Sequence, residues 1–190
     1  MIPMLKPLLI ALIACVGLAA CSSPTNRVDL EPLQSEVRRT ATVSSVMVRT
    51  VSLPTYAAAE EIAIQNADGI IVTSGDVLWA DLPDRAATLT ITGHLNTILS
   101  AVVGPDPWPF VDLPGAIVEI RVEEMIAGND GLFRLRGQYF IGGDASAFRK
   151  TVVQFNHTAP LSDVNVASVA TAQSQVLLAL SEDIAGSLSR

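Results

Sequence analysis

The amino-acid sequence predicts an α+β domain in which two main helices pack on a mixed, largely antiparallel sheet. Apolar residues recur every three or four positions in two long segments, 81–103 and 163–188, which is the period of an amphipathic helix. Three segments with strand-like composition, 116–126, 132–141 and 148–157, follow one another between glycine-rich turns. This spacing is typical of an antiparallel meander.

The first 21 residues have the features of a bacterial lipoprotein signal. Lys6 supplies a positive charge, an apolar run covers 8–18, and small residues precede Cys21. The run has the ~7–15 residue length of a signal core and falls short of the roughly 18 residues that span a bilayer. We therefore expect cleavage after residue 20 and lipidation of Cys21, which would attach the exported chain to a membrane. The alternative is a plain secretory signal with an incidental cysteine.

The mature chain would be acidic. Removing residues 1–20 takes away Lys6, so the 12 basic residues of the full chain become 11, against 19 acidic residues, and the formal net charge becomes −8. This balance disfavours binding to nucleic acid or to anionic lipid through a basic patch, and ordinary solubility is its simplest role. Ser22 follows Cys21 in place of the aspartate that favours inner-membrane retention, so we expect the periplasmic face of the outer membrane.

Three regions follow from the composition: a signal peptide over 1–20, a lipidated tether over 21–40, and a single α+β domain over 41–190. The segment 21–40 has two prolines and few large apolar residues, which predicts a flexible tether with room for one short strand. The β-branched run 41–53 predicts a strand that Pro54 ends. The 170 residues left after cleavage are enough for one domain with a sizeable core.

A hairpin is predicted over 61–72, because Asp68-Gly69 stands between two apolar stretches, and residues 73–76 are interpreted as a further turn. For the helix over 81–103, Asp81 or Asp84 is the expected N-cap, Pro83 suits the first turn, and Gly104-Pro105 would end it. The loop 104–114 then holds four prolines around Trp108 and Phe110. We expect this loop to be rigid and partly exposed.

Side chains with catalytic or metal-binding chemistry are sparse. His94 and His157 have no metal-binding spacing, and we expect both at the surface or at a strand edge. Ser74 lacks the flanking glycines of a nucleophile elbow. The adjacent carboxylates, such as Glu123-Glu124, would point to opposite faces of a strand. We therefore expect no enzyme activity, no cofactor and no metal.

Several short motifs occur together in one order: residues 51–56 (Val-Ser-Leu-Pro-Thr-Tyr), residues 78–82 (Leu-Trp-Ala-Asp-Leu), and Leu95-Asn96 with Leu99, all behind the lipoprotein signal. In this the chain resembles the accessory lipoproteins of ABC-type transport systems, the paraquat-inducible protein C (PqiC) family. The resemblance implies a non-enzymatic outer-membrane subunit of a lipid transport system that contains a permease, an ATPase and a periplasmic MCE-domain protein. The lipoprotein would dock that periplasmic partner, either alone or as a homo-oligomer.

Aromatic residues are the candidates for the docking surface, because they concentrate at interface hot spots. The candidates are Tyr56, Trp79, Trp108 and Phe110, and for Tyr56 and Trp79 a place in the core is the competing interpretation. Two other functions stay open. A lipid-binding carrier would need an apolar pocket between helices and sheet, and an envelope hydrolase would need a role for Ser74 or His94.

Overall fold

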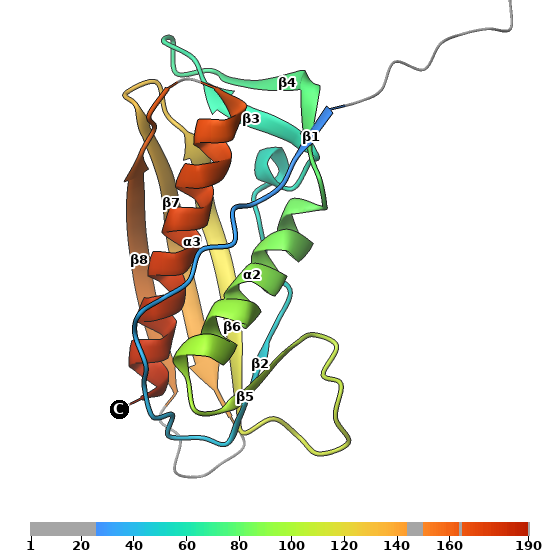
Figure 1. Ribbon diagram of the computed structural model, residues 1–190, viewed down its shortest axis with the longest axis vertical. Coiled ribbons are helices and arrows are strands. Elements are labelled where there is room, and N and C mark those ends of the chain that lie inside the picture. The colour runs from blue at the N-terminus through green and yellow to red at the C-terminus, as the bar shows by residue number, and fades with distance from the viewer. Residues whose placement is uncertain (1–25, 144–149, 164, 190) are drawn as a thin grey trace, which may run out of the picture.

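The computed structural model describes residues 26–143, 150–163 and 165–189, and Figure 1 shows them as one elongated body. The signal peptide, Cys21 and residues 148–149 of the last predicted strand lie outside this part of the chain. The elements run in the order β1 (Asn26–Val28), β2 (Ser45–Val48), the 3-10 helix η1 (Thr55–Ala57), β3 (Glu61–Gln65), β4 (Ile71–Trp79), α2 (Pro83–Ile98), β5 (Val102–Pro105), β6 (Ala116–Ala127), β7 (Leu132–Gly142), β8 (Thr151–Pro160) and α3 (Val166–Leu188).

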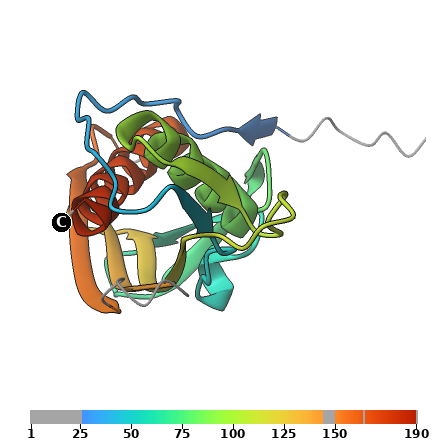
Figure 2. The same cartoon turned by 90° about the horizontal axis from the view of Figure 1, so that it is seen from below.

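The strand β6 is paired along both of its edges. On one edge β7 pairs antiparallel from Ile117 to Ala127, with a register shift between Val122 and Glu124. On the other edge β2 pairs parallel at the start of β6, Ser52 bridges Arg121, and β3 pairs parallel at Ala127. The strands β4 and β1 extend the sheet beyond β3, β5 extends it beyond β2, and β8 extends it beyond β7. The sheet curls around the helices (Figure 2).

The expectation of a largely antiparallel sheet is wrong. Four of the seven strand pairings among the described residues are parallel, namely β1–β4, β2–β5, β2–β6 and β3–β6. Parallel neighbours need a crossover connection, and α2 lies in the connection from β2 to β5. The apolar alternation along a strand reports which face is buried and carries no information on the direction of its partner.

The antiparallel meander of β6, β7 and β8 is confirmed, because the predicted segments pair in sequence with continuous register. The alternation in β6 also has its expected meaning: Val118 and Ile120 are fully buried, whereas Arg121 is exposed. The hairpin of β3 and β4 is confirmed as well, with Gly69 at φ 78° in its turn. Residues 73–76 form no turn and lie inside β4.

Both long helices lie on the inner face of the curled sheet (Figures 1 and 2). The core joins the apolar stripe of α3, the apolar stripe of α2 and the inward side chains of β6 and β7. Its fully enclosed members include Ile91, Leu95, Ile120, Leu135, Leu177, Leu180 and Ile184. Apolar burial of this kind contributes roughly 25 cal/mol per Å² and is the main source of stability for the fold.

The predicted helix over 81–103 is shorter than expected. α2 begins at Pro83, as the first-turn proline indicated, but its N-cap is Leu82 and no aspartate side chain caps it. The helix ends before Leu99, and the chain re-enters the sheet as β5. The amide of Asn96 explains this early end: it donates to the carbonyl of Val103 at 2.7 Å and accepts from the N–H of Val103 at 3.0 Å.

Residues 26–40 contain one short strand, for which the predicted tether had room, and they pack on the helices. β1 pairs with β4, and the following segment, residues 29–37, crosses α2 and α3 and is called the N-terminal strap below (Figure 1). The N–H of Glu31 donates to Ser174 Oγ at 2.9 Å, and the Ser35 hydroxyl donates to Glu182 at 2.6 Å. Ser174 and the carboxylate of Glu182 lie on α3, so the helix supplies polar partners that a composition argument misses.

Gly137 of β7 lies against the backbone of β6, opposite Val122. A Cβ at this position would lie 2.2 Å from the carbonyl oxygen of Arg121 and 2.9 Å from the ring of Phe155. Backbone atoms cannot move aside cheaply, so we expect Gly137→Ala to destabilise the domain by about 2 kcal/mol or more. Urea unfolding followed by circular dichroism measures this. Gly75→Ala is the matched control, because a Cβ there meets no atom within 4 Å, and an equal loss in both variants would contradict the prediction.

Candidate functional site

The loop between β5 and β6, residues 106–115, carries two of the predicted aromatic residues and is called the aromatic loop. Its two ends are fixed to β2, because the N–H of Asp106 donates to the carbonyl of Val48 at 2.8 Å and the N–H of Gly115 donates to Ser45 Oγ at 3.0 Å. Inside the loop, Trp108 Nε1 donates to the carbonyl of Asp112 at 2.7 Å. The loop is therefore held in one shape by hydrogen bonds at both ends and in the middle.

Trp108 and Phe110 contact each other edge to face, with ring centroids 5.0 Å apart and planes at 62°. The indole of Trp108 also lies over Gly104, where an added Cβ would stand 3.0 Å from the ring. Trp108 is half-buried by these contacts, whereas Phe110 is 50% exposed. The tryptophan thus organises the loop, and the phenylalanine presents apolar surface to solvent.

The aromatic loop exposes more apolar surface than the two aromatic residues supply. Val111 is fully exposed and Leu113 is 76% exposed, and Val102 of β5 is 53% exposed. Beside the loop a groove of about 560 Å³ runs over the outer face of the sheet, lined by Leu113, Pro114, Ile117, Phe140 and Val152. Exposed apolar side chains gathered beside a groove make this surface a candidate interaction site.

Charged side chains edge this groove. Arg49, Glu119 and Lys150 line it, and Arg49 lies 3.4 Å from the carboxylate of Glu119. The guanidinium of Arg121 stands 5.0 Å from the centre of the Phe140 ring, a cation–π contact. An apolar centre with a charged rim is the usual anatomy of a protein-binding surface.

The structure separates the other two aromatic candidates from the aromatic loop. Trp79 ends β4 and is 8% exposed, and Tyr56 lies in η1, half-buried against the core. The Tyr56 hydroxyl accepts from the N–H of Met125 at 3.3 Å. The core interpretation fits both residues, because their rings are enclosed by the fold and only a small part could reach a partner.

His94 is buried, contrary to the expectation of a surface histidine. It is 7% exposed on α2, where Nδ1 lies 3.1 Å from Ser181 Oγ and Nε2 lies 3.1 Å from the carbonyl oxygen of Leu33. A carbonyl only accepts, so the Nε2 nitrogen carries the proton in the neutral ring. Burial lowers the pKa of His94, and the Leu33 carbonyl and the Glu182 carboxylate oppose this shift in part. His94 therefore joins α2, α3 and the N-terminal strap.

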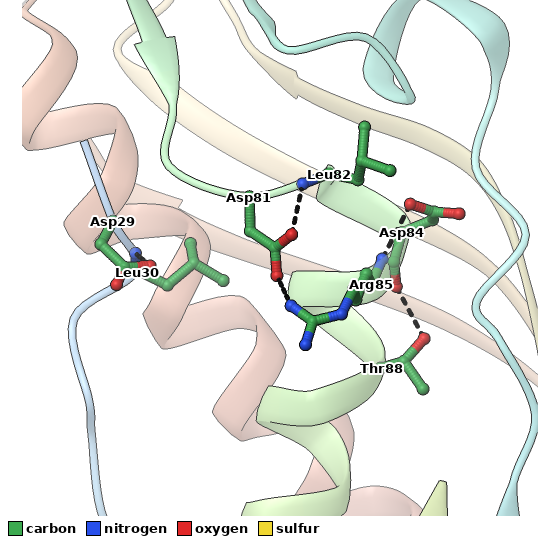
Figure 3. A network of polar contacts seen from close by, with 7 residues as sticks. All are labelled: Asp29, Leu30, Asp81, Leu82, Asp84, Arg85 and Thr88. Atoms are coloured by element: carbon green, nitrogen blue, oxygen red, sulfur yellow. Dashed lines mark hydrogen bonds and ion pairs between the residues drawn. The ribbon is translucent and has the colours of Figure 1, made fainter. Parts of the chain in front are cut away.

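A groove of about 710 Å³ lies between the N-terminal strap and α2, with Leu33, Leu89 and Thr97 among its lining residues. At its mouth the carboxylate of Asp81 forms an ion pair with Arg85 and accepts from the N–H of Leu82 at 2.9 Å (Figure 3). Asp29 lies on the strap side of the mouth. Asp81 and Arg85 pair with each other, and Asp29 accepts from the N–H of Leu30 at 2.8 Å. The buried His94, which also lines the groove, has partners at both ring nitrogens.

In the part of the chain that the structure describes, neither histidine belongs to a group that could bind a metal ion. Within the described ranges no group of three or more His, Cys, Asp and Glu side chains could hold a metal ion. His157 lies in β8, stacked on Phe155 with its Nε2 3.1 Å from the carboxylate of Asp183, and His94 lies on α2. Of the helices in the described part of the chain, none is long and apolar enough to cross a membrane.

Sequence reasoning missed two features of these surfaces: the exposed apolar residues of the aromatic loop and the packing of the N-terminal strap. Val111 and Leu113 escaped notice because neither residue type signals exposure, although their place between prolines in a loop could have suggested it. The packing of the strap was missed because its polar partners, Ser174 and Glu182 of α3 and His94 of α2, are far from it in the sequence. Ser174 and Ser181, seven residues apart on the buried stripe, were the available signal, since small polar residues on an apolar helix face allow a neighbouring chain to approach.

Solved structures with a similar fold exist. Seven chains match, and a search of the curated proteins finds no match. A crystal structure of an uncharacterized protein has a TM-score of 0.69 at 16% identity and covers 86% of this chain and 99% of its own. A protein from Xanthomonas campestris has a TM-score of 0.62 at 16% identity, with 86% and 91% covered. A PelC dodecamer from Paraburkholderia phytofirmans has a TM-score of 0.42 at 13% identity, with 83% and 98% covered. At these identities the likeness concerns the fold alone.

An α+β body with a rigid, exposed aromatic loop fits a component that works through surface contacts. Residues 29–185 match the family of the ABC-type transport auxiliary lipoprotein component, and the chain belongs to this family. It is therefore an auxiliary lipoprotein of an ABC-type transport system, held to a membrane by its lipid. The family is one of transport components and is not known for enzymatic activity.

The buried His94 makes stability depend on pH. Burial lowers its pKa from the ordinary 6.5, so near pH 6 the unfolded chain binds more protons than the folded one. We expect its contribution to be fully present above about pH 6.5 and to be lost as pH falls from there toward the folded pKa. Urea midpoints at pH 8 and pH 5.5, for wild type and His94→Gln, measure the effect. The glutamine can still donate to the Leu33 carbonyl but does not titrate, and an unchanged pH dependence would refute the assignment.

Proposed function

We propose that this protein is the outer-membrane subunit, of the PqiC type, of an ABC-type lipid transport system and that it docks a periplasmic MCE-domain partner. Family membership supports the transport role, and Ser22 after Cys21 favours the outer membrane. The observation that carries the docking role is the aromatic loop: Phe110, Val111 and Leu113 expose apolar side chains close together in the sequence, on a backbone fixed at both ends. A preorganised loop loses little entropy on binding.

Trp108 and Phe110 retain the roles assigned to them as partner-binding residues, with a division of labour. Phe110 would enter a pocket of the partner, and Trp108 would hold the loop in shape behind it, because its Nε1 is already bonded to Asp112. Tyr56 and Trp79, also candidates from the sequence, would contribute through the core that positions β4 and η1. Val111 and Leu113 replace them in the proposed contact surface.

The lipid-carrier alternative receives less support from the interior of the fold. Two cavities described between the helices and the sheet, one lined by Trp79 and Pro83 and the other by Ile62 and Phe133, have volumes of about 10 Å³ each. That is the volume for one water and far below what an acyl chain needs. The groove beside the aromatic loop is larger but open to solvent, so it suits a protein segment better than an enclosed lipid.

A photo-crosslinking amino acid in place of Val111 tests the docking surface in envelope membranes. Val111 is fully exposed, so its replacement should leave folding unchanged while joining the chain to an MCE-domain protein. The same crosslinker at Leu89, which is 42% exposed on α2, is the matched control and should give no such product. Mass spectrometry of the joined bands identifies the partner. Lipid products alone, or equal yields at both positions, would count against docking through this loop.

Loss of the tether gives a second readout. With Cys21→Ala the chain is no longer held beside its partner, so we expect the yield of the crosslink at position 111 to fall, because the effective concentration of the two proteins is lower. The triple variant Phe110→Ser, Val111→Ser, Leu113→Ser should lose capture even when tethered. Its thermal stability should stay near that of wild type, since exposed side chains contribute little to folding.

Homo-oligomerisation is the further proposal, and β8 is the edge that could carry it. Within the described residues β8 pairs only with β7, and its ten residues include no Lys, Arg, Asp or Glu. Edges of such length are usually protected by charge. If a second copy pairs there, Gln154→Lys should shift the protein to monomer in sedimentation velocity, because like charges would then face each other across the pair. A wild-type chain that sediments as a monomer at all concentrations would exclude oligomers.

A further inference from the structure

The tip of the β3–β4 hairpin exposes three consecutive apolar side chains. Ile70 is 58%, Ile71 40% and Val72 46% exposed. The turn that presents them is well ordered by hydrogen bonds: the N–H groups of Asp68 and Ile70 both donate to Asn66 Oδ1, at 3.0 and 2.9 Å. Single exposed apolar residues are ordinary, but three in a row at a rigid tip form a local surface that water solvates poorly.

The hairpin lies at the same end of the long axis as the start of β1 (Figure 1). β1 is hydrogen-bonded to β4, the strand that follows the tip, with Asn26 opposite Val77. The lipid attachment residue, Cys21, stands five residues before Asn26, and five extended residues reach at most about 18 Å. The lipid anchor therefore holds this end of the body within a short distance of the membrane surface.

We propose that Ile70, Ile71 and Val72 insert into the phospholipid leaflet that holds the lipid anchor of the same chain. The contact would be apolar, because the hairpin sequence 61–79 contains Glu61, Asp68 and Asp76 and no Lys or Arg. Attraction to anionic head groups is therefore not its source. Asp68 lies in the turn itself, beyond the Gln65–Ile71 pair, so the hairpin would meet the leaflet obliquely, with the Ile70–Val72 edge of β4 against the acyl chains and the Asp68 carboxylate among the head groups.

Three side chains cannot attach a protein to a membrane by themselves, since even one myristoyl chain gives only marginal binding. Next to a lipid anchor they act at high effective concentration, and their contribution becomes one of orientation. With the tip in the leaflet, the long axis stands up from the membrane and the aromatic loop, at the opposite end in Figure 1, faces away from it. The inference rests on lipidation at Cys21 and is independent of the identity of the docking partner.

Site-directed fluorescence on the full lipidated chain tests the contact. Ile71→Cys, labelled with an environment-sensitive dye, places the probe at the tip; the lipidated Cys21 does not react, and Cys15 leaves with the signal peptide. In phosphatidylcholine vesicles we expect a blue-shifted emission that nitroxide-labelled lipids quench and that aqueous iodide does not. High salt should leave both results unchanged, because the contact is apolar. Leu113→Cys, 76% exposed in the aromatic loop, is the control and should be quenched by iodide alone.

The quenching results distinguish insertion of the hairpin into the leaflet from its alternatives. Quenching by iodide at position 71 as strong as at position 113 would overturn the insertion, and protection from both quenchers would overturn it in favour of a protein, such as a second copy, that covers the tip. Ile70→Cys gives an independent probe of the same contact if the first variant misfolds. Flotation of the vesicles reports lipidation separately. A chain that does not float with the vesicles would overturn attachment at Cys21. A chain that floats but is quenched by iodide at position 71 would overturn the hairpin contact alone.

Discussion

The backbone pairing of β6 is the constraint on which the rest of the structure depends. A buried strand must satisfy its N–H and C=O groups on both edges, and β6 does so with four separate segments of the chain. β7 covers one edge over nearly its whole length, and β2, Ser52 and β3 share the other. Two of those segments in turn position the proposed contact surfaces. β2 fixes both ends of the aromatic loop, and β3 forms the hairpin with β4. The positions of the aromatic loop and of the hairpin therefore both depend on β6, which lies inside the sheet.

Short-range sequence patterns correctly predicted the elements that are determined by neighbouring residues in the chain. The β3–β4 hairpin follows from Asp68-Gly69, because the turn needs a positive φ that glycine adopts, and the meander and α3 follow from their periodicities. The sequence patterns did not predict the parallel pairing of strands, because such pairing depends on crossovers between segments far apart in the sequence. The end of α2 was not predicted for a related reason. The side chain of Asn96 forms two hydrogen bonds with the backbone of Val103, and helix propensities do not account for such a contact.

The same division applies to the candidate surfaces. Prolines around Trp108 and Phe110 indicated a rigid, exposed loop, because restricted backbone and missing N–H donors keep such a segment out of helix and sheet. Tyr56 and Trp79 show the limit of that reasoning. The sequence does not distinguish an aromatic residue in the core from one at an interface, because only the tertiary structure decides its burial. The sequence predicts a surface or edge position for His94, because it lies mid-helix beside Gly93 with few chemistry-bearing residues near it. Its burial became favourable only because Leu33 and Ser181, from two other segments, offer partners to both ring nitrogens.

The path of the N-terminal strap has a mechanical consequence. The lipid attachment lies at one end of this path, so any pull between membrane and body enters the fold through β1. β1 runs alongside β4 with three paired residues, and the N–H of Ala80 donates to the Val28 carbonyl at 2.8 Å, so a load along the strand acts on these hydrogen bonds in shear and together. Beyond them, the Glu31–Ser174 and Ser35–Glu182 contacts take up the load on α3. Only after these contacts does the chain reach β2, to which both ends of the aromatic loop are fixed, so the strap shields that loop from a pull on the anchor.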